Sequence, residues 1–364
     1  MVINYNVTSN CSFLQVLWAI INRQTANAIW RLYGKHHCIS LLLGLGLVED
    51  NFLLVVDTNN GTIHQLDLSD ESIWQLPLSE MNYPVAVQFN PTDRKVYWTE
   101  LRENIIKSSY LNGTDEKTIS TLHRGSFLVG LAIDMVSGLV YFTEGGADII
   151  AAVTLDGRQH FTLVTEDMDE PQDIVLDLER GMMYWTDKGE SPRIEKASMN
   201  GNDRSLVIDF EFRAVPVGLA IDSNGERLFW CDASLDKIQS ISLSDGQKTS
   251  VIMHLYSPGL QHFGIALLGD NLYFTGVRKN YVSRINVKDS SPIAVRVGPS
   301  NFNMSSGITA YRSTRRTNGF EANSVCSVRN GDCEQICLAT PNGPQCACEN
   351  GFTTAKTCSI PTCE

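Results

Sequence analysis

A four-residue pattern returns along this chain at a nearly constant interval, and it restricts the fold more than any other feature. It consists of two aromatic residues, usually a threonine, and an acid, and its copies begin every 43 to 45 residues. A degenerate copy, Leu54-Val55-Val56-Asp57, lies 43 residues before the first full one. A period of this length with strand-like composition predicts a repeat architecture. The full copies are Tyr97-Trp98-Thr99-Glu100, Tyr141-Phe142-Thr143-Glu144, Tyr184-Trp185-Thr186-Asp187, Phe229-Trp230-Cys231-Asp232 and Tyr273-Phe274-Thr275-Gly276.

A second motif runs in phase with the first and predicts a neighbouring strand. Runs such as Gly218 to Ile221 are apolar throughout, which is typical of strands buried on both faces. Asn-Gly and Asp-Gly pairs at 112–113, 156–157, 200–201 and 245–246 predict hairpin turns in which both residues have positive φ. Four short strands per unit, repeated six times, predict an all-β, six-bladed β-propeller. The copies of this motif are Pro84 to Asn90, Val129 to Asp134, Pro171 to Asp177, Val217 to Asp222, Phe263 to Leu268 and Ser306 to Tyr311.

The two ends of the repeat region complement each other. The first aromatic-type strand, Leu53 to Asp57, has no buried strand before it, and the last buried strand, Gly307 to Tyr311, has no aromatic strand after it. Together they complete one unit. We therefore expect N-terminal and C-terminal strands to share the blade that closes the ring, which removes exposed sheet edges.

Charge and cysteine content indicate the setting. The net charge is −12, which argues against nucleic acid as a partner, because binding phosphates requires clustered Lys and Arg. Six of the ten cysteines lie between Cys326 and Cys358, a density that predicts a disulfide framework and an oxidising, extracellular location. Zinc is the rival interpretation, but this segment has no histidine and lacks two C-x2-C pairs.

Sequons and the N-terminal segment add two further expectations. Asn60, Asn112 and Asn303 are candidates for glycosylation within the propeller, and Asn6 and Asn10 also lie in sequons. Residues 1–48 contain no acid and two apolar stretches too short to span a bilayer. Three interpretations stay open for this segment: a truncated or mis-assembled N-terminus, an unusual signal sequence, or a genuine structured extension.

The two motifs, their period and the cysteine module together resemble the class B, or YWTD, repeats of the LDL-receptor family followed by an EGF-like domain. The resemblance covers roughly residues 50 to 360 and is closest in look to the Wnt co-receptor members among the LDL-receptor-related proteins. It implies a propeller that binds extracellular protein ligands and catalyses nothing. It also implies disulfides Cys326 with Cys337, Cys333 with Cys346, and Cys348 with Cys358. The calcium-binding sequence of some EGF-like domains is missing before Cys326, so no metal is expected there.

The repeated acids have two interpretations. They form a ring by the construction of the fold, so they are either an acidic ligand face or hydrogen-bond acceptors that tie one blade to the next. We favour the second, because a group repeated in most blades is explained by what every blade needs. Gly276 interrupts the series. The acids are Asp57, Glu100, Glu144, Asp187 and Asp232.

The ligand face is better sought in residues that differ between blades. In a propeller, the loops after the second strand and before the first emerge at the same end of the ring. Exposed aromatics beside charges are plausible anchors there, although a solvated loop residue is the alternative for each of them. The candidates are Tyr83, Arg102, Glu103, Phe127, Asp148, Glu170, Lys188, Glu190, Phe212, Asp236, Gln261, His262 and Arg278.

Several departures and absences bear on function. Lys188 and Val277 stand where the binding propellers of the Wnt co-receptors often have Trp, so an aromatic platform for a short peptide is reduced. Cys231 replaces the repeat threonine and is expected to be a packed free thiol. Cys11, Cys38 and Cys363 have no assigned partner. The five histidines of the propeller share no repeat position and no catalytic motif is present, so neither an enzyme nor a cofactor is expected.

The sequence therefore predicts an atypical segment at 1–48, a propeller at 49–315, a linker at 316–325, an EGF-like domain at 326–358 and the start of a further segment at 359–364. The predicted function is a non-catalytic, extracellular or cell-surface module of an LDL-receptor-related receptor that binds protein ligands, with any membrane attachment made by parts outside this chain. A matrix-docking protein of nidogen-like type is the alternative.

Overall fold

The computed structural model describes residues 51–353 apart from short gaps at 212, 223–226, 236, 245–247, 255–261, 277–279, 290–291, 301, 313–325, 327–328 and 349–350. The predictions made for residues 1–48, 316–325 and 359–364 lie outside the described residues. So do those for Asn6, Asn10, Cys11, Cys38, Cys358 and Cys363.

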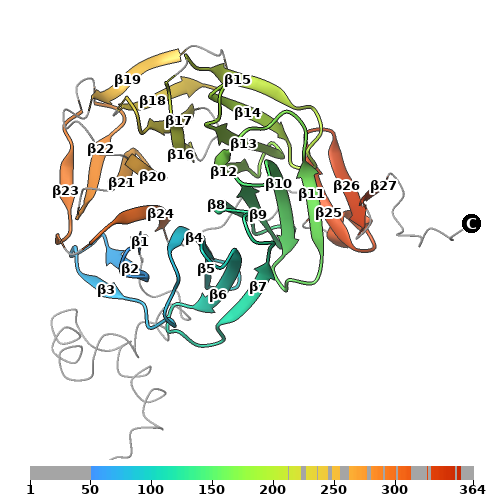
Figure 1. Ribbon diagram of the computed structural model, residues 1–364, viewed down its shortest axis with the longest axis horizontal. Coiled ribbons are helices and arrows are strands. Elements are labelled where there is room, and N and C mark those ends of the chain that lie inside the picture. Colours follow the sequence, from blue (N-terminus) through green and yellow to red (C-terminus); the bar gives the residue numbers. More distant parts are fainter. Residues whose placement is uncertain are drawn as a thin grey trace, which may run out of the picture. The chain divides into compact units, whose positions relative to one another are not determined.

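Six four-stranded antiparallel sheets surround a central axis, and each sheet is one blade (Figure 1). Blade 1 contains β24 (Ser305–Arg312), β1 (Asn51–Asp57), β2 (Thr62–Asp67) and β3 (Ile73–Gln75), from the inner to the outer strand. Blade 2 contains β4 (Pro84–Asn90), β5 (Lys95–Glu100), β6 (Ile105–Tyr110) and β7 (Lys117–Thr121), and blade 3 contains β8 (Leu128–Asp134), β9 (Leu139–Glu144), β10 (Ile149–Thr154) and β11 (His160–Val164).

The remaining three blades continue around the ring in chain order. Blade 4 contains β12 (Pro171–Asp177), β13 (Met182–Asp187), β14 (Arg193–Ser198) and β15 (Ser205–Asp209). Blade 5 contains β16 (Pro216–Ile221), β17 (Arg227–Asp232), β18 (Lys237–Ser242) and β19 (Lys248–His254). Blade 6 contains β20 (His262–Leu268), β21 (Asn271–Gly276), β22 (Val282–Asn286) and β23 (Val295–Val297).

The expected closure of the ring is confirmed. The last propeller strand, β24, pairs antiparallel with the first, β1, so that Leu53 lies opposite Ala310 and Val55 opposite Ile308. β1 is almost fully buried, whereas most residues of β24 are half-buried or exposed. The two ends of the repeat region therefore hold blade 1 together through backbone hydrogen bonds.

A threonine hydroxyl joins the inner strands of neighbouring blades. Each inner strand has a register irregularity near its start, for example between Pro171 and Ile174 in β12, and such bulges release backbone groups from the ladder. The repeat threonine forms a hydrogen bond with one of these groups. In blade 4, Thr186 Oγ1 accepts a hydrogen bond from Asp173 N at 3.0 Å and donates one to Val217 O of the next blade at 2.9 Å. Thr143 and Thr275 make the same pair of contacts in blades 3 and 6.

Blade 1 has no threonine at this place in its degenerate repeat, and other hydroxyls supply the link. Thr58 Oγ1 donates to Pro84 O at 2.8 Å, and Ser306 Oγ donates to Val85 O at 3.2 Å. The apolar core lies between the blades, where the side chains of Trp98, Trp185 and Trp230 are fully buried.

The hairpin turns form where the sequence predicts them, but their conformation differs from the prediction. Only the glycine has positive φ, at 79° in Gly113, 76° in Gly157 and 86° in Gly201. Its N–H bonds to the carbonyl three residues earlier, as in Gly113 N to Tyr110 O at 2.9 Å. A Cβ atom on Gly113 would also lie 2.1 Å from Pro77 O of the preceding blade. The glycine is therefore required both by the turn and by the close approach of two blades. Asp245 and Gly246 lie outside the described residues.

The EGF-like module packs against the propeller. It contains the 3-10 helix η1 (Arg329–Asp332) and the strands β25 (Ile336–Thr340), β26 (Gly343–Cys348) and β27 (Gly351–Thr353). Disulfides join Cys326 to Cys337 and Cys333 to Cys346, which are the first two pairs implied by the resemblance. The partner implied for Cys348, Cys358, lies outside the described residues.

The contact between module and ring is both apolar and polar. Ile336, Leu338 and Ala347 are buried in one cluster with propeller residues that include Met183 and Met199. Gln159 Nε2 donates to Gln335 Oε1 at 3.1 Å. A Cβ atom on Gly181, in the turn between β12 and β13, would lie 2.8 Å from Thr340 Cα. The module is therefore seated on the turns of blades 3 and 4. Across the described part of the chain, no helix has the length and apolar content needed to cross a membrane.

The threonine link gives a first prediction. Replacing Thr186 by Val keeps the shape of the side chain but leaves Asp173 N and Val217 O without their partner. Each buried, unsatisfied group costs about 1–3 kcal/mol, so we expect Thr186→Val to lower the free energy of unfolding in urea by about 2–4 kcal/mol. Thr186→Ser keeps the hydroxyl and is the matched control. Equal stability of the two variants would contradict the assigned role.

Candidate ligand-binding face and central channel

Two sets of loops meet at one end of the ring, and we call this end the rim face. In blades 2 to 4 it consists of residues 79–83, 101–104, 122–127, 145–148, 165–170 and 188–192. The loops are paired through the backbone: Leu101 N donates to Tyr83 O at 3.0 Å and Gly145 N to Phe127 O at 3.0 Å. The rim face thus gathers eight of the sequence candidates, namely Tyr83, Arg102, Glu103, Phe127, Asp148, Glu170, Lys188 and Glu190.

The other candidates lie beyond what the structure describes. Phe212, Asp236, Gln261 and Arg278 fall in gaps, and only the backbone of His262, at the start of β20, is described.

Three rim residues have a backbone conformation that is rare for side chains of their size. Tyr83, Phe127 and Glu170, each directly before an inner strand, have φ of 65°, 49° and 63°. Such conformations are strained and persist only where the surroundings impose them. Asn104 Oδ1 accepts from Phe127 N at 3.0 Å, and Asp148 Oδ1 accepts from Glu170 N at 2.8 Å. Asp148 therefore positions the next blade's loop, a role that the sequence did not indicate.

The aromatic residues of the rim are exposed to different degrees. Phe127 is 54% exposed, and its ring occupies space that a Cβ atom on Gly146 would fill. The guanidinium of Arg102 lies over the ring of Tyr83, 4.9 Å from the ring centroid. This is a cation–π contact, in which the positive charge is attracted to the ring face. Glu103 accepts from Asn82 Nδ2 at 2.6 Å. Blades 2 and 3 thus present two aromatic side chains beside charges of both signs.

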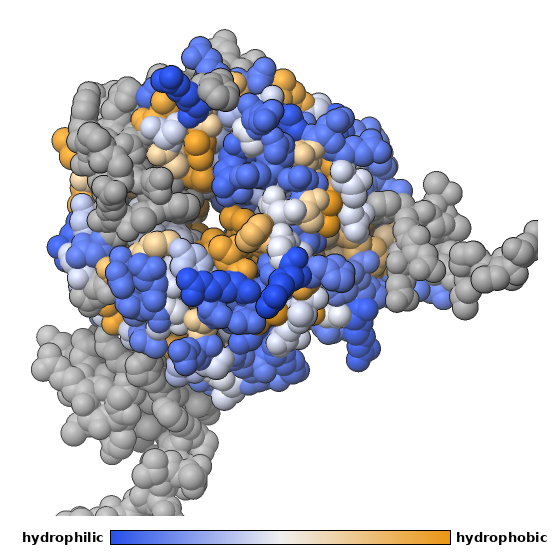
Figure 2. Space-filling view, in the orientation of Figure 1, coloured by the Kyte–Doolittle hydropathy of each residue, from blue (hydrophilic) through white to orange (hydrophobic). Residues whose placement is uncertain are grey.

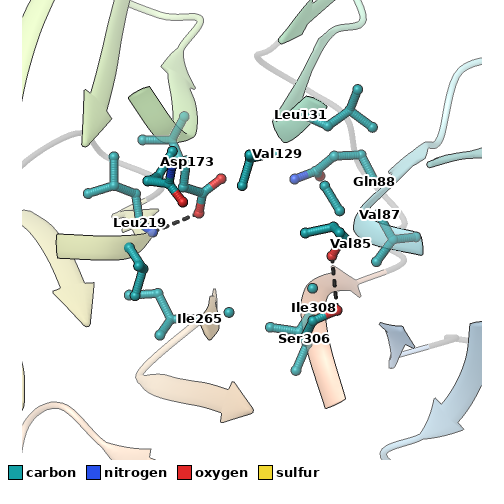
Figure 3. Close-up of a pocket in the computed structure, with 16 residues that line it drawn as sticks. Val85, Val87, Gln88, Val129, Leu131, Asp173, Leu219, Ile265, Ser306 and Ile308 are labelled. Atoms are coloured by element: carbon teal, nitrogen blue, oxygen red, sulfur yellow. Dashed lines mark hydrogen bonds between the residues drawn. The ribbon is translucent and has the colours of Figure 1, made fainter. Parts of the chain in front are cut away.

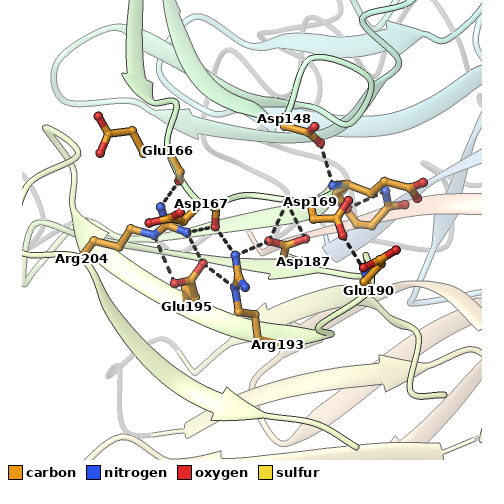
Figure 4. Close-up of polar contacts among 11 residues, drawn as sticks. Asp148, Glu166, Asp167, Asp169, Asp187, Glu190, Arg193, Glu195 and Arg204 are labelled. Carbon is orange, nitrogen blue, oxygen red and sulfur yellow. Dashed lines mark hydrogen bonds and ion pairs between the residues drawn. The ribbon is translucent and has the colours of Figure 1, made fainter. Parts of the chain in front are cut away.

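An acidic segment, residues 165–170, forms part of the rim face on blade 4 (Figure 4). Two arginines hold its backbone: Arg204 donates to Asp167 O at 2.7 Å, and Arg193 donates to the same carbonyl. Both arginines are also paired with buried or half-buried acids, Arg193 with Asp187 at 3.0 Å and Arg204 with Glu195 at 2.7 Å. The charge of the arginines is therefore already balanced.

The segment's own carboxylates are left to face solvent. Glu166 and Asp167 are exposed and have no ion pair with any described residue. The nearby Glu190 is exposed as well, while Glu170 pairs with Lys188 at 3.2 Å. The rim of blade 4 consequently carries a net negative charge, and it lies at the same end of the ring as Tyr83 and Phe127.

The repeated acids, in contrast, are buried. Asp57 accepts from Asn303 N at 2.8 Å, and Glu100 accepts from Asn82 N at 2.7 Å. Asp187 and Asp232 accept from Asp169 N and Val215 N in the same way. The donor is each time the loop that enters the blade from its predecessor, while Glu144 bonds to the side chain of Ser126 in the equivalent loop. These carboxylates hold the connections between blades and are not a ligand face.

Burial changes the acidity of two of them. It raises the pKa of Asp187 to about 6, although the N–H of Asp169 and the Arg193 charge act in the opposite direction. It also raises the pKa of Glu144. Desolvation of a carboxylate disfavours its charged form, so both directions follow from the depth of these groups in the fold.

The six inner strands surround a central channel. Apolar side chains border its opening (Figure 2), and inside it is a cavity of about 70 Å³ lined by residues of all six blades' inner strands, including Val87, Leu131, Leu219, Ile265 and Ile308. The lining contains one ionisable side chain, Asp173. The other five copies of the second motif have Ala or Gly at the position equivalent to Asp173, namely at 86, 130, 218, 264 and 307. Aligning the second motif would have revealed this exception.

The carboxylate of Asp173 bonds to backbone groups of two blades. Oδ1 accepts from Ile174 N at 2.9 Å, and Oδ2 accepts from Leu219 N of blade 5 at 2.8 Å (Figure 3). Burial raises its pKa to about 7 despite these two hydrogen bonds. No described residue forms an ion pair with it, so its charge lacks a counter-ion.

Cys231 lies close to this carboxylate. It is a fully buried free thiol, as expected from the sequence, and burial raises its pKa well above the ordinary value, with the charges of Asp173 and Asp232 adding to the effect. Among the described residues, no group of three or more His, Cys, Asp or Glu side chains is arranged to hold a metal ion.

Known proteins are similar to this chain in sequence and in fold. The model of the low-density lipoprotein receptor repeat class B family matches residues 138–178 and 181–223. A human low-density lipoprotein receptor-related protein 5-like protein is 32% identical over 192 residues, which are 52% of this chain and 74% of the relative. This chain belongs to the low-density lipoprotein receptor class B repeat family. The matched residues include the acidic segment and Asp173.

Longer relatives and solved structures extend the comparison. Low-density lipoprotein receptor-related protein 5 is 32% identical in human and 33% in mouse over 279 residues, and the chain spans 17% of the length of each. The propeller in the crystal structure of a nidogen/laminin complex is 25% identical, with a TM-score of 0.64, over 71% of this chain and 98% of that one. A streptogramin B lyase, at 19% identity over 72% of this chain and 84% of the lyase with a TM-score of 0.52, shares the fold alone.

The position of Asp173 gives a prediction for this class B repeat protein. Because its pKa is raised from 3.8 to about 7 in the folded chain, the folded state holds a proton that the unfolded state releases between these values. Stability therefore falls as the pH rises from about 4 to 7, by up to about 1.4 kcal/mol per pH unit. Asp173→Asn cannot titrate, so unfolding free energies measured across this range should show the wild type losing stability relative to the variant. Parallel pH profiles would contradict the assignment.

Proposed function

We propose that this chain is an extracellular, non-catalytic binding module of a low-density lipoprotein receptor-related receptor, and that its rim face binds a protein ligand with basic side chains. One observation carries the proposal: Glu166 and Asp167, which have no ion pair with a described residue, are exposed with Glu190 on the same end of the ring as the exposed Phe127. Buried aromatic anchors supply most of the binding energy in protein interfaces, and complementary charges around them give rate and specificity. A basic partner fits the net charge of −12.

We also propose a receptor role within Wnt signalling, because local sequence strings resemble those of the Wnt co-receptors. Low-density lipoprotein receptor-related protein 5, which matches 75% of this chain, supports the receptor role. Lys188 and Val277 nevertheless replace aromatic residues expected in short-peptide binding. We therefore propose that the ligand is a folded protein recognised across blades 2 to 4. Catalysis is not part of the proposal, because the enzymes among the structural neighbours are less than 25% identical and share the fold alone.

Charge reversal on the rim gives the first test of this function. We expect Glu103→Lys and Glu190→Lys each to weaken binding by about 3- to 10-fold, mainly by slowing association at low salt. Binding is measured by biolayer interferometry of the immobilised chain against a panel of secreted Wnt proteins and, for the matrix alternative, laminin. Asp156→Lys, in a turn at the opposite end of the ring, is the control. Unchanged binding in both rim variants would refute the proposed face, and binding of laminin alone would favour matrix docking.

Passage through the secretory pathway gives a second test. Asn112 is exposed in a hairpin turn, and its Oδ1 accepts from Thr114 N at 3.1 Å and Thr114 Oγ1 at 2.7 Å, which leaves its Nδ2 directed to no described partner. Asn60 Nδ2 instead donates to Asp57 at 2.9 Å, and Asn303 Nδ2 contacts Asn60. We expect Asn112 to carry an N-glycan in secreting animal cells. Loss of one glycosidase-sensitive mass increment in Thr114→Ala, but not in Thr114→Ser, is the predicted result, and an equal mass for both would contradict it.

A further inference from the structure

The exception at Asp173 places a charge where the repeat otherwise has none. In the neighbouring copies the absence of a side chain lets inner strands approach closely: a Cβ atom on Gly130 would lie 2.4 Å from Gln172 O, and one on Gly307 would lie 2.2 Å from Val85 O. Asp173 occupies the equivalent place in β12 and lines the cavity of the channel, opposite Val85 and Gln88 (Figure 3). A carboxylate therefore stands at a position where the other copies of the repeat have Ala or Gly.

This carboxylate has unused capacity for a ligand. Each of its oxygens accepts one backbone N–H, whereas a carboxylate oxygen can accept two hydrogen bonds. Among the described residues, no arginine, lysine or histidine lines the cavity. Asp173 is half-buried by its exposed surface; a partly desolvated carboxylate without a counter-ion is destabilised, and an opposite charge within about 4–6 Å relieves this. The site is thus selective for a cation.

The walls of the cavity restrict which cation fits. Val87, Leu131, Val175 and Ile308 line the same cavity as the carboxylate and make its walls largely apolar, which favours an alkyl chain beside the charge. Calcium and magnesium take about six or more oxygen ligands, and the lining provides a single carboxylate. An ammonium group has three donors and is compact, so it matches one carboxylate in a small space.

We propose that the central channel is a binding site for a primary alkylammonium group. Asp173 is the counter-ion, and apolar side chains of the inner strands contact the alkyl chain. The group comes either from a lysine side chain of a protein or from a free small amine. This site lies inside the ring and is separate from the rim residues on which the proposed function rests, so each proposal can fail without the other.

The site is tested with n-butylammonium chloride as the probe. We expect its titration at about pH 8 to shift the NMR methyl signals of Leu219, Ile265 and Ile308, because the alkyl chain lies against them, while n-butanol, which lacks the charge, gives shifts at least about tenfold weaker at equal concentration. Equal responses to both compounds, or no response to either, would overturn the proposal.

Two variants separate the charge from the shape of the site. Asp173→Asn removes the charge with little change in volume, and Val129→Phe fills the cavity while keeping the carboxylate. We expect each to weaken n-butylammonium binding about tenfold or more. Asp156→Asn, in an exposed turn outside the channel, should leave it unchanged. If Asp173→Asn binds the probe as well as the wild type, Asp173 is not the counter-ion.

The pH dependence provides a test on the unmodified chain. The groups around Asp173 from the adjoining strands are Thr186 of β13, the N–H of Leu219 in β16, and Cys231 of β17, with Asp232 next to it held by Val215 N. Burial keeps Cys231 neutral in this range. Binding should therefore weaken about tenfold for each pH unit below about 6 as Asp173 is protonated, and an affinity independent of pH would contradict the assignment.

A final experiment distinguishes the two sources of the amine, a lysine side chain of a protein and a free small amine. A pentapeptide with a central lysine flanked by glycines is titrated beside n-butylammonium. If both bind in the channel, a protein's lysine is the natural occupant. If only n-butylammonium binds, the site belongs to a free amine, and the chemical assignment is supported in both cases.

Discussion

The hydroxyl that bridges neighbouring inner strands is the contact on which the rest of this propeller depends. Each inner strand is irregular near its start, which frees backbone groups close to the channel, and the threonine of the repeat satisfies one in its own blade and one in the next. The same atom thus completes one sheet and fixes its neighbour. Because a buried, unpaired backbone group is costly, this short-range requirement helps to set the spacing of neighbouring blades wherever the threonine is present, as in blades 3, 4 and 6.

With the blades fixed in this way, the chain can vary at two places without altering the ring. One is the rim, where Phe127 and Glu170 adopt unusual backbone angles and side chains of the preceding blade bond to their N–H groups. The other is the junction of blades 4 and 5, where Asp173 and Cys231 both depart from the repeat and lie near each other. The carboxylate takes a backbone donor from each of its two blades, so the departure adds a link as well as a charge.

The repeat period and the two in-phase motifs were sufficient to predict the propeller, its six blades and the pairing of its first and last strands, because each follows from local patterns that recur. The turn conformation was predicted wrongly, since the need for Gly113 arises partly from Pro77 in another blade. Asp148 lies on the rim face, as the sequence predicts, but its hydrogen bond to Glu170 N in the next blade was not predicted. Contacts between blades are absent from any single motif, and this explains why the site was less predictable than the fold.

The pairing of β1 with β24 has a consequence for how the chain is made. Blades 2 to 5 each consist of consecutive hairpins and can assemble as they are synthesised, but Asp57 meets Asn303 across 246 residues. Contacts of such long range are slow to form. Until the last propeller strand has emerged, β1 keeps an exposed edge that invites pairing with other chains. The ring is therefore completed by its final strand, and a ribosome that stops short of residue 305 releases a chain with an open seam.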